Sequence, residues 1–375
     1  MIHTGEYPPQ QGGVADYSGQ LARGLADAGD NVTVFAPLPR VHSKSSGRLT
    51  VEALPHLLNP LFQRHIARRL DSLPERARIL SQYVPHALGA KGVNMPVANT
   101  LSRQGNHPVD IMFHEVAYPY SADGKLRHRF LARTQARMAR AVASRADRIF
   151  VAAMGWQTLL EKLLGRPVST QWLPVPSNLP LKAQASSVAD VRKRYAPAGE
   201  TIIGHFSTHS NDIHDYLREA IPRLLGADAR RVFLLVGRRA EESFRSLSGL
   251  SREVMQRTVA VRGSDQDNVV AHLAACDLVI QPFPDGVSGR RGTAMAPLAL
   301  GVPVLTTSGP MTESLWENSD AVALSPAANS KDFSARAEQL LANRSACEAL
   351  GRRGAELYRA HFALEHTIKT LRRVE

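Results

Sequence analysis

The stretch with the clearest chemistry is a glycine-rich loop between an expected strand and an expected helix, within PFPDGVSGRRGTAMAPLALGVPVLTTSG, residues 282–309. Gly286 and Gly289 allow the backbone to turn sharply and to approach a ligand closely. Arg290 and Arg291 stand where the next helix begins, so guanidinium groups and helix-start amides would converge on one anion. This arrangement suits a phosphate or a diphosphate. The alternative is an ordinary strand–helix connection with two surface arginines.

An acidic residue, Asp285, directly precedes the loop glycine. A carboxylate has no obvious role beside a phosphate, but it can accept hydrogen bonds from the hydroxyl groups of a sugar. A sugar next to a diphosphate is a nucleotide-sugar. The loop therefore predicts a glycosyl transferase.

The same loop resembles the donor loop of GT-B-fold glycosyltransferases of the large retaining family 4. In that family a Glu, seven residues and a second Glu frame the loop, whereas this chain has Asp285 and Thr293 at the two positions. The resemblance implies that Asp285 holds the donor sugar, while Thr293 offers only one hydroxyl where the family has an acid for the ribose. The donor contacts that it implies come from Gly286, Val287, Ser288, Gly289, Arg290 and Arg291, and the implied catalytic residues are His114, Asp285 and Arg291.

Two segments of the first half extend the resemblance. Gly12 and Gly13, in YPPQQGGVADY, open an expected helix whose first amides could meet the donor phosphate or the acceptor. Asp16 follows in the first turn, where it either compensates the helix dipole or contacts the acceptor. His114 and Glu115 end an expected strand, at the sheet edge where open α/β sheets bind ligands. The resemblance gives His114 a contact with the donor sugar and Glu115 an orienting or acceptor-side role; the alternative for His114 is a hydrogen bond to the backbone.

The charge of the donor diphosphate needs cationic partners in the second half. Family members usually place an Arg and a Lys after the first strand there, but GHFSTHS (204–210) has neither and offers His205 among other polar residues. Arg290 and Arg291 are the leading replacements, and Arg238 and Arg262 are further donor-side candidates.

An Asp-x-Asp at 265–267 has a spacing that binds metal in a different glycosyltransferase fold, but it directly precedes an expected helix, where a capping role is expected. No metal and no cofactor is expected.

The elements around these residues form two βα series. In the first half we expect strands at 32–35, 78–84, 109–115 and 148–153, and helices at 14–28 and 125–145, the latter with Phe130 and Met138 inward. In the second half we expect strands at 201–207, 232–237, 258–263, 278–283, 302–307 and 321–324. The predicted fold is α/β, a GT-B fold of two Rossmann-like doubly wound domains that face a cleft. The predicted domains are 1–178 on the acceptor side, 179–355 for the donor, and 356–375 as a helix that returns to the first domain.

Composition narrows the class of protein. The 375 residues are 43% hydrophobic, without a signal peptide, a membrane-length apolar run or a cysteine pattern, so we expect a cytoplasmic location. The net charge is +12, and residues 1–180 hold 21 Lys and Arg against 12 Asp and Glu, which is +9. Arg129, Arg133, Arg137 and Arg140 share one helix face, and segment 61–70 is similarly basic. These faces are either merely solvated, or they contact anionic lipid at the inner membrane face or an acidic or lipid-linked acceptor.

Three functions are compatible with these features. The first is a retaining transferase that moves a sugar from a UDP- or GDP-sugar to a hydroxyl acceptor in polysaccharide, glycolipid or other glycoconjugate synthesis. The second is a basic nucleotide- or nucleic-acid-binding protein, although no nucleic-acid motif and only 6% aromatic residues argue against nucleic acid. The third is a degenerate transferase, because of Thr293 and the missing Arg and Lys.

Overall fold

A computed structural model of the chain describes all residues except 39–43, 55–65, 67, 70–73, 75–76, 102–106, 122–124, 209–210, 248, 264, 328–329 and 374–375. The chain divides into two compact units. Unit 1 comprises Met1–Val175 and Leu364–Glu375, and unit 2 comprises Pro176–Ala363. The predicted basic segment 61–70 lies largely outside the described residues.

Unit 1 is built on a sheet whose described strands run in the order β3-β4-β2-β1-β5-β6-β7-β8. All neighbouring strands are parallel except β3 and β4. The strands are β1 (Ile2–His3), β2 (Val32–Ala36), β3 (Lys44–Ser46), β4 (Leu49–Ala53), β5 (Ile79–Tyr83), β6 (Val109–Phe113), β7 (Arg148–Val151) and β8 (Gln171–Trp172). The two-residue β1 is central, because it pairs with both β2 and β5.

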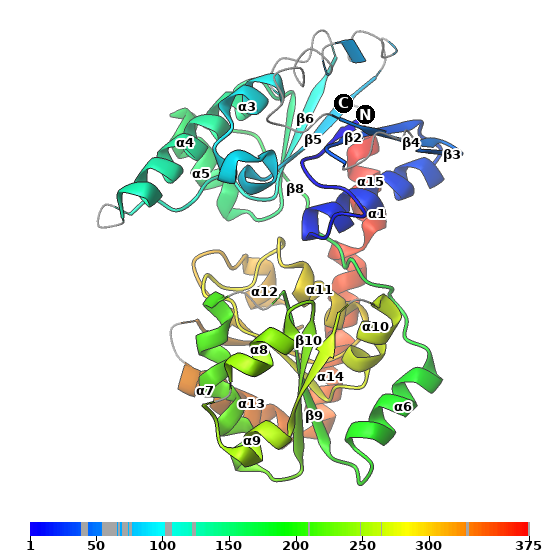
Figure 1. Cartoon of the computed structure of the whole chain (residues 1–375), viewed down its shortest axis with the longest axis vertical. Coiled ribbons are helices and arrows are strands. Elements are labelled where there is room, and N and C mark those ends of the chain that lie inside the picture. The colour runs from blue at the N-terminus through cyan, green and yellow to red at the C-terminus, as the bar shows by residue number, and fades with distance from the viewer. Residues whose placement is uncertain are drawn as a thin grey trace. The chain divides into compact units, whose positions relative to one another are not determined.

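Helices cover both faces of this sheet (Figure 1). They are α1 (Gly13–Asp27), α3 (Met95–Leu101), α4 (Leu126–Ala143), α5 (Gly155–Leu164) and α15 (Leu364–Arg372), with short 3-10 turns at Pro85–Leu88 and Ala90–Gly92. One buried cluster joins the sheet to α3, α4 and α5, and includes Met138 and Ile111. The other joins it to α1 and α15, and includes Leu21 and Leu371.

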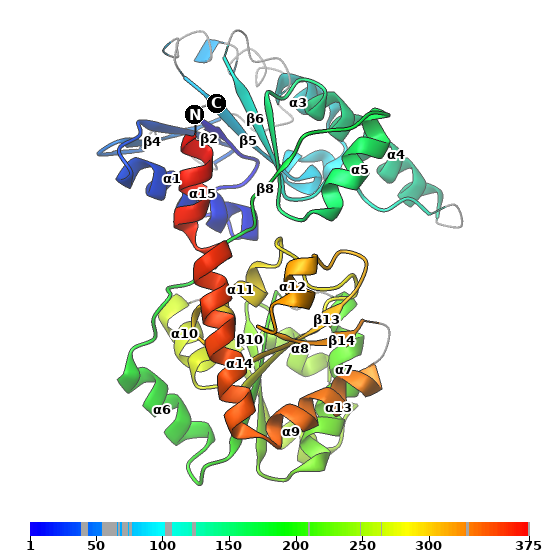
Figure 2. The ribbon, with the colours of Figure 1, turned by 180° about the vertical axis from the view of Figure 1, so that it is seen from behind.

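The last helix belongs to unit 1, as predicted. Helix α15 lies beside α1 in both views (Figures 1 and 2). The guanidinium group of Arg372 pairs with Asp30 at 3.2 Å, and Arg148 Nη2 donates to the Leu371 carbonyl at 3.0 Å. The side chain of Ile368 packs directly against Gly24 of α1, because a Cβ at this position would overlap it. The chain thus closes the core of unit 1 with its final helix.

Unit 2 has a six-stranded parallel sheet in the order β11-β10-β9-β12-β13-β14. The strands are β9 (Thr201–Phe206), β10 (Arg231–Gly237), β11 (Thr258–Arg262), β12 (Leu278–Gln281), β13 (Val304–Ser308) and β14 (Ala323–Pro326). The helices are α6 (Ala185–Tyr195), α7 (Asn211–Ala227), α8 (Ala240–Ser246), α9 (Arg252–Gln256), α10 (Gln266–Ala274), α11 (Gly292–Ala299), α12 (Ser314–Asn318), α13 (Ser330–Leu341) and α14 (Arg344–Leu357), followed by a π-helical turn at Tyr358–Phe362.

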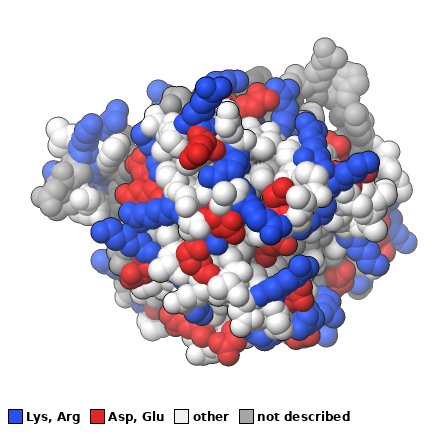
Figure 3. All heavy atoms as spheres, turned by 90° about the horizontal axis from the view of Figure 1, so that it is seen from below, with Lys and Arg blue, Asp and Glu red and all other residues white. Residues whose placement is uncertain are grey.

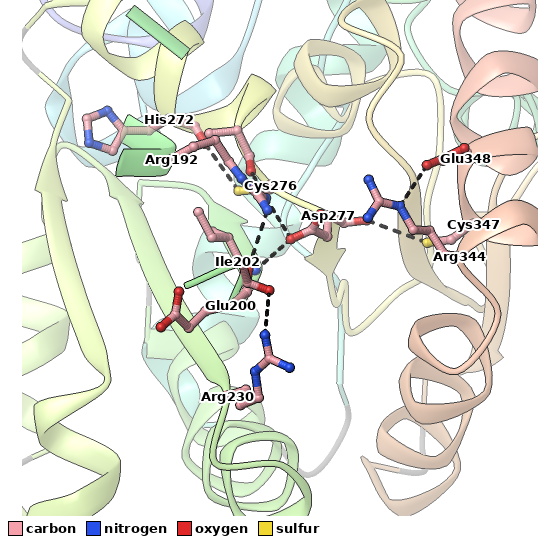
Figure 4. A network of polar contacts seen from close by, with 12 residues as sticks. Arg192, Glu200, Ile202, Arg230, His272, Cys276, Asp277, Arg344, Cys347 and Glu348 are labelled. Atoms are coloured by element: carbon pink, nitrogen blue, oxygen red, sulfur yellow. Dashed lines mark hydrogen bonds and ion pairs between the residues drawn. The ribbon is translucent and has the colours of Figure 1, made fainter. Parts of the chain in front are cut away.

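Polar contacts tie the elements of unit 2 together at the amino-terminal edge of its sheet (Figure 4). Asp277, just before β12, accepts hydrogen bonds from the Ile202 amide at 2.7 Å and from Arg192 Nη1 at 2.8 Å. A cavity of about 440 Å³ lies at this edge, and both cysteines line it. Burial raises the pKa of the Cys276 thiol and raises that of Cys347 to about 11, so both thiols stay protonated at neutral pH.

One predicted orientation in α4 is wrong. Met138 is fully buried, as expected, but Phe130 is 64% exposed. The buried face of α4 also includes Ala132, Gln135, Ala139 and Val142. Phe130 lies on the opposite face from these residues, together with the arginines.

Candidate functional site

The glycine-rich loop lies at the point where the strand order of unit 2 reverses. From β9 the chain adds strands on one side, β10 and β11, and from β12 it adds them on the other, β13 and β14. Loops at the carboxyl ends of two strands that diverge in this way leave a crevice, which is where doubly wound sheets bind ligands. The loop 282–291 follows β12, so it stands at this binding position.

The segment after β13 holds the loop in place. Gly286 has φ of 90°, and a Cβ there would overlap the Gly309 backbone and the Thr312 side chain, so only glycine fits. The Met311 amide donates to the Asp285 carbonyl at 3.0 Å. The segment after β13 therefore fixes the backbone of the loop.

Asp285 is paired with both loop arginines. Arg290 Nη2 donates to Asp285 Oδ2, and Arg291 Nη2 donates to Asp285 Oδ1. The side chains of Asp285, Arg290 and Arg291 are 33%, 17% and 21% exposed, so the cluster is half-buried but reachable from solvent. Burial acts to raise the pKa of Asp285, but the charges and hydrogen bonds of Arg291 and Arg290 outweigh it, and the pKa lies below its ordinary value. The three residues form one charged group with a surplus of one positive charge.

The loop amides have partners within the protein, which the sequence did not indicate. The Val287 amide donates to the Thr307 carbonyl at 2.8 Å. The Gly289 amide donates to both carboxylate oxygens of Glu313, each at 3.1 Å. Glu313 is 8% exposed and also accepts a hydrogen bond from Trp316 Nε1 at 2.9 Å. A phosphate bound by these amides would have to displace a backbone carbonyl and a buried carboxylate, whereas at the arginines it would displace only the Asp285 carboxylate, which is one-third exposed.

Ser288 and Thr293 flank this arrangement. Ser288 is fully buried, and its hydroxyl has no hydrogen-bond partner among the described residues. Thr293 is half-buried in the first turn of α11, and its carbonyl accepts a hydrogen bond from Gln281 Nε2 at 3.1 Å. Gln281 Nε2 also donates to the Phe206 carbonyl at 2.8 Å, which links β9, β12 and α11 beneath the loop.

His205 does not reach the surface, so its predicted contact with the donor needs correction. It is fully buried within β9, where Nδ1 donates to the Ile280 carbonyl at 2.8 Å and Nε2 lies 2.9 Å from Ser207 Oγ. The donation from Nδ1 leaves Nε2 of a neutral ring as the acceptor for the Ser207 hydroxyl. His205 therefore orients Ser207, which directly follows the strand, and His209 lies outside the described residues.

The two further donor-side candidates lie at the carboxyl ends of β10 and β11 and not after β12. Arg238 is exposed directly after β10, and Arg262 ends β11. Arg262 Nη2 pairs with the carboxylate of Glu241 at 3.0 Å. Because β11 is three strands from β12, and strands lie about 4.8 Å apart, the backbone of Arg262 lies about 14 Å from that of β12. Arg262 is therefore not part of the group formed by Asp285 and the two loop arginines.

In unit 1, His114 directly follows β6 in a buried position, 7% exposed. Nε2 of the ring lies 2.7 Å from Gln82 Oε1, and the ring of Tyr17 packs edge-on with centroids 4.8 Å apart. Burial lowers the pKa of His114 to about 4, so the ring is neutral at pH 7. The hydrogen bond to Gln82 puts the ring proton on Nε2 and makes Nδ1 an acceptor. The ring can thus accept a hydrogen bond from a substrate hydroxyl but carries no positive charge.

The glycine pair of unit 1 opens α1 at the carboxyl end of the central strand. Gly12 is the N-cap residue, and any side chain there would overlap the carboxylate of Glu6. Gly13 is exposed at the helix start, and Asp16 is half-buried in the first turn, so both readings of Asp16 stay open. Glu115 is half-buried after β6.

The predicted capping role of the Asp-x-Asp is confirmed. Asp265 is the N-cap of α10, and its side chain accepts a hydrogen bond from the Asp267 amide at 3.1 Å. Among the described residues no three His, Cys, Asp or Glu side chains are grouped as a metal site would require.

Comparisons with known proteins agree with this architecture. Sucrose-phosphate synthase from Thermosynechococcus elongatus matches with a TM-score of 0.72 and 18% identity, over 99% of this chain and 96% of that one. A trehalose-phosphate synthase from Burkholderia vietnamiensis matches with 0.70 and 12%, over 99% and 95%. HepE from Anabaena, in complex with UDP and glucose, matches with 0.69 and 16%, over 99% and 97%. A search of curated proteins finds no match.

The chain therefore has the GT-B fold, and it is a glycosyltransferase. Residues 200–343, which span β9 to α13 and contain the donor loop, match the family model of the glycosyl transferases group 1. Both the predicted fold and the predicted enzyme class are confirmed.

Proposed function

We propose that this protein is a retaining glycosyltransferase that moves a sugar from a nucleoside diphosphate sugar to a hydroxyl acceptor. The observation that carries the proposal is the pairing of Asp285 with both Arg290 and Arg291 at the reversal point of the unit 2 sheet. Two guanidinium groups match a diphosphate, and a carboxylate matches sugar hydroxyls. Binding of a phosphate alone would not require the carboxylate of Asp285.

The pairing suggests how the donor engages the loop. An incoming diphosphate takes hydrogen bonds from Arg290 and Arg291 in place of Asp285. The carboxylate of Asp285, released from its partners, then accepts hydrogen bonds from hydroxyls of the sugar. Because the pKa of Asp285 lies below its ordinary value, the group is ionised at neutral pH and ready for this exchange.

The chemical step breaks the bond between the anomeric carbon and the diphosphate oxygen and forms a bond from that carbon to the acceptor oxygen on the same face. The acceptor proton passes to an oxygen of the departing diphosphate. The two arginines stabilise the charge that develops on the diphosphate, so no divalent metal is required for this purpose. In unit 1, the neutral His114 accepts a hydrogen bond from a substrate hydroxyl through Nδ1 and takes no proton.

The donor nucleotide and the product class are finer parts of the proposal. We propose a UDP- or GDP-sugar as donor and glycolipid, polysaccharide or another glycoconjugate as product. The similar HepE structure holds UDP and glucose, which makes UDP-glucose the first donor to test. An anionic or lipid-linked acceptor would suit the excess positive charge of residues 1–180.

A panel of UDP- and GDP-sugars tests the proposal. We expect one donor to raise the melting temperature and to release nucleoside diphosphate, first to water and faster with an acceptor. Proton NMR of the first product formed should give the anomeric configuration of the donor. Stabilisation by nucleotides without release in any acceptor mixture would favour a nucleotide-binding protein or a degenerate transferase. Inversion of the anomeric configuration would refute the retaining mechanism.

A further inference from the structure

Helix α4 of unit 1 exposes a stripe that combines apolar and basic side chains. At 100° per residue, Leu126, Phe130, Arg133, Arg137 and Arg140 fall within about 80° of the helix circumference. The buried residues of α4, among them Gln135, Met138 and Val142, are centred on the opposite side. The stripe, which we call the α4 stripe and define by these five exposed residues, is therefore not needed for the core of unit 1.

The apolar part of the α4 stripe is unusual for a solvated helix. Leu126 is 80% exposed and Phe130 is 64% exposed, one turn apart. Tyr120, just before the helix, is 52% exposed, and Arg133 Cζ lies 5.5 Å from the centre of its ring. Three of the large hydrophobic side chains that the described part of the chain exposes thus lie within eleven residues. Single exposed hydrophobic residues need no explanation, but a group of them on an exposed helix face does.

The charge of α4 is of one sign. The helix contains Arg127, Arg129, Arg133, Arg137 and Arg140 but neither Asp nor Glu. On the face of the molecule drawn in Figure 3, by contrast, Lys and Arg side chains are mixed with Asp and Glu. A solvated helix gains from pairs of opposite charge four residues apart, and α4 has none. Its composition instead fits an anionic partner.

We propose that the α4 stripe docks the protein on an anionic lipid bilayer. Leu126 and Phe130 enter the boundary between headgroups and acyl chains, and Arg133, Arg137 and Arg140 contact the phosphates. A helix that lies in the interface has this division into an apolar part and a basic, acid-free part, and long arginine side chains reach headgroups from a partly inserted helix. A soluble acidic polymer would use the arginines but would leave Leu126 and Phe130 in water.

Among the described helices, none is both long and apolar enough to cross a membrane.

Vesicle co-sedimentation of the full-length protein tests the proposal without any need for transferase activity. Vesicles of phosphatidylcholine alone are compared with vesicles that also contain phosphatidylglycerol, at low and at high salt. We expect binding only to the anionic vesicles, weakened by salt. Replacement of the three arginines, R133Q/R137Q/R140Q, should lower the partition coefficient about 100-fold, since each basic group contributes about fivefold. L126S/F130S should lower it about tenfold or more at both salt concentrations, because salt does not screen apolar insertion.

Matched controls come from unit 2. Leu181→Ser removes another exposed large hydrophobic residue, 47% exposed, and R245Q/R252Q/R344Q removes three exposed arginines. Both should bind vesicles as the wild type does, and all variants should keep the wild-type melting temperature. The proposal is overturned if the wild type ignores anionic vesicles at low salt, or if the α4 variants and the controls behave alike. It is also overturned if L126S/F130S binds like the wild type while the arginine variant loses binding to vesicles and to heparin alike, an outcome that would indicate an acidic soluble partner.

Discussion

Asp285→Asn separates the two ligands that the donor loop is proposed to bind. In the wild type a nucleoside diphosphate must compete with the Asp285 carboxylate for Arg290 and Arg291. Asparagine keeps the size of the side chain but loses the charge. We therefore expect nucleoside diphosphate to bind more tightly to the variant, while turnover of the nucleotide-sugar falls because the sugar loses its carboxylate.

The size of the effect follows from the exposure of the three side chains. A hydrogen bond to a charged group contributes roughly 1.5–3 kcal/mol. Asp285 is one-third exposed, so solvent screening reduces the sum for its two bonds to roughly 1–2 kcal/mol. Removal of this competition should tighten binding of UDP or GDP by roughly 5- to 30-fold.

Isothermal titration calorimetry with UDP and GDP measures the change, and nucleotide release from the accepted nucleotide-sugar measures turnover. Asp277→Asn is the matched control, because Asp277 is also 33% exposed and also paired with an arginine, Arg192, but at the opposite edge of the sheet. It should leave nucleotide affinity unchanged. If Asp285→Asn binds nucleoside diphosphate with wild-type or weaker affinity, the proposed exchange of partners does not occur.

Four further predictions concern the two units. Arg291→Ala should weaken nucleoside diphosphate binding by roughly 1.5–3 kcal/mol, measured by calorimetry, and an unchanged affinity would exclude a diphosphate at this residue. Glu313→Ala should raise the KM for the donor more than it lowers kcat, because the Gly289 amide loses its acceptor. Glu313→Gln should restore much of the loss, since its amide oxygen can still accept that hydrogen bond. Equal effects of both variants would contradict this positioning role. Turnover should persist in EDTA, and loss with rescue by Mg²⁺ or Mn²⁺ would overturn metal independence. Burial lowers the pKa of His3 and of His114 to about 4 from 6.5, so the unfolded state takes up protons first as pH falls. The free energy of unfolding, measured with urea, should therefore be lower at pH 5.5 than at pH 7.5 by about 1.4 kcal/mol for each of the two histidines. In His114→Asn this difference should be smaller by the contribution of one histidine.

The sequence predicted four of the eight described strands of unit 1 and all six described strands of unit 2, because most of these predicted strands are parallel and buried on both faces. Such strands are short apolar runs between turns, and the predicted run at 109–115 corresponds to β6 at Val109–Phe113. The same property explains the error at His205. Where both faces of a strand are covered, a polar residue inside the run is buried as well, and His205 lies within β9.

The orientation of Phe130 could have been predicted from spacing alone. Phe130 precedes Arg133 by three residues and Arg137 by seven, so the helical period puts all three on one face. An inward Phe130 is therefore inconsistent with an outward face of arginines. Glu313 is different, because it lies 24 residues beyond Gly289 and no local pattern links them. Only the packing of the segment after β13 against the donor loop brings its carboxylate to that amide.

The return of α15 to unit 1 has a consequence for the synthesis of the protein. Leu371 and Ile368 complete the cluster that contains Leu21 and Phe150, and they are translated after the whole of unit 2. Unit 2, which is one continuous segment, can therefore fold on the ribosome while unit 1 still lacks its closing helix. During that interval the apolar side chains of unit 1 that Ile368 and Leu371 cover are exposed to water. The order of folding along this chain is thus the reverse of the usual one, since the unit that begins first is finished last.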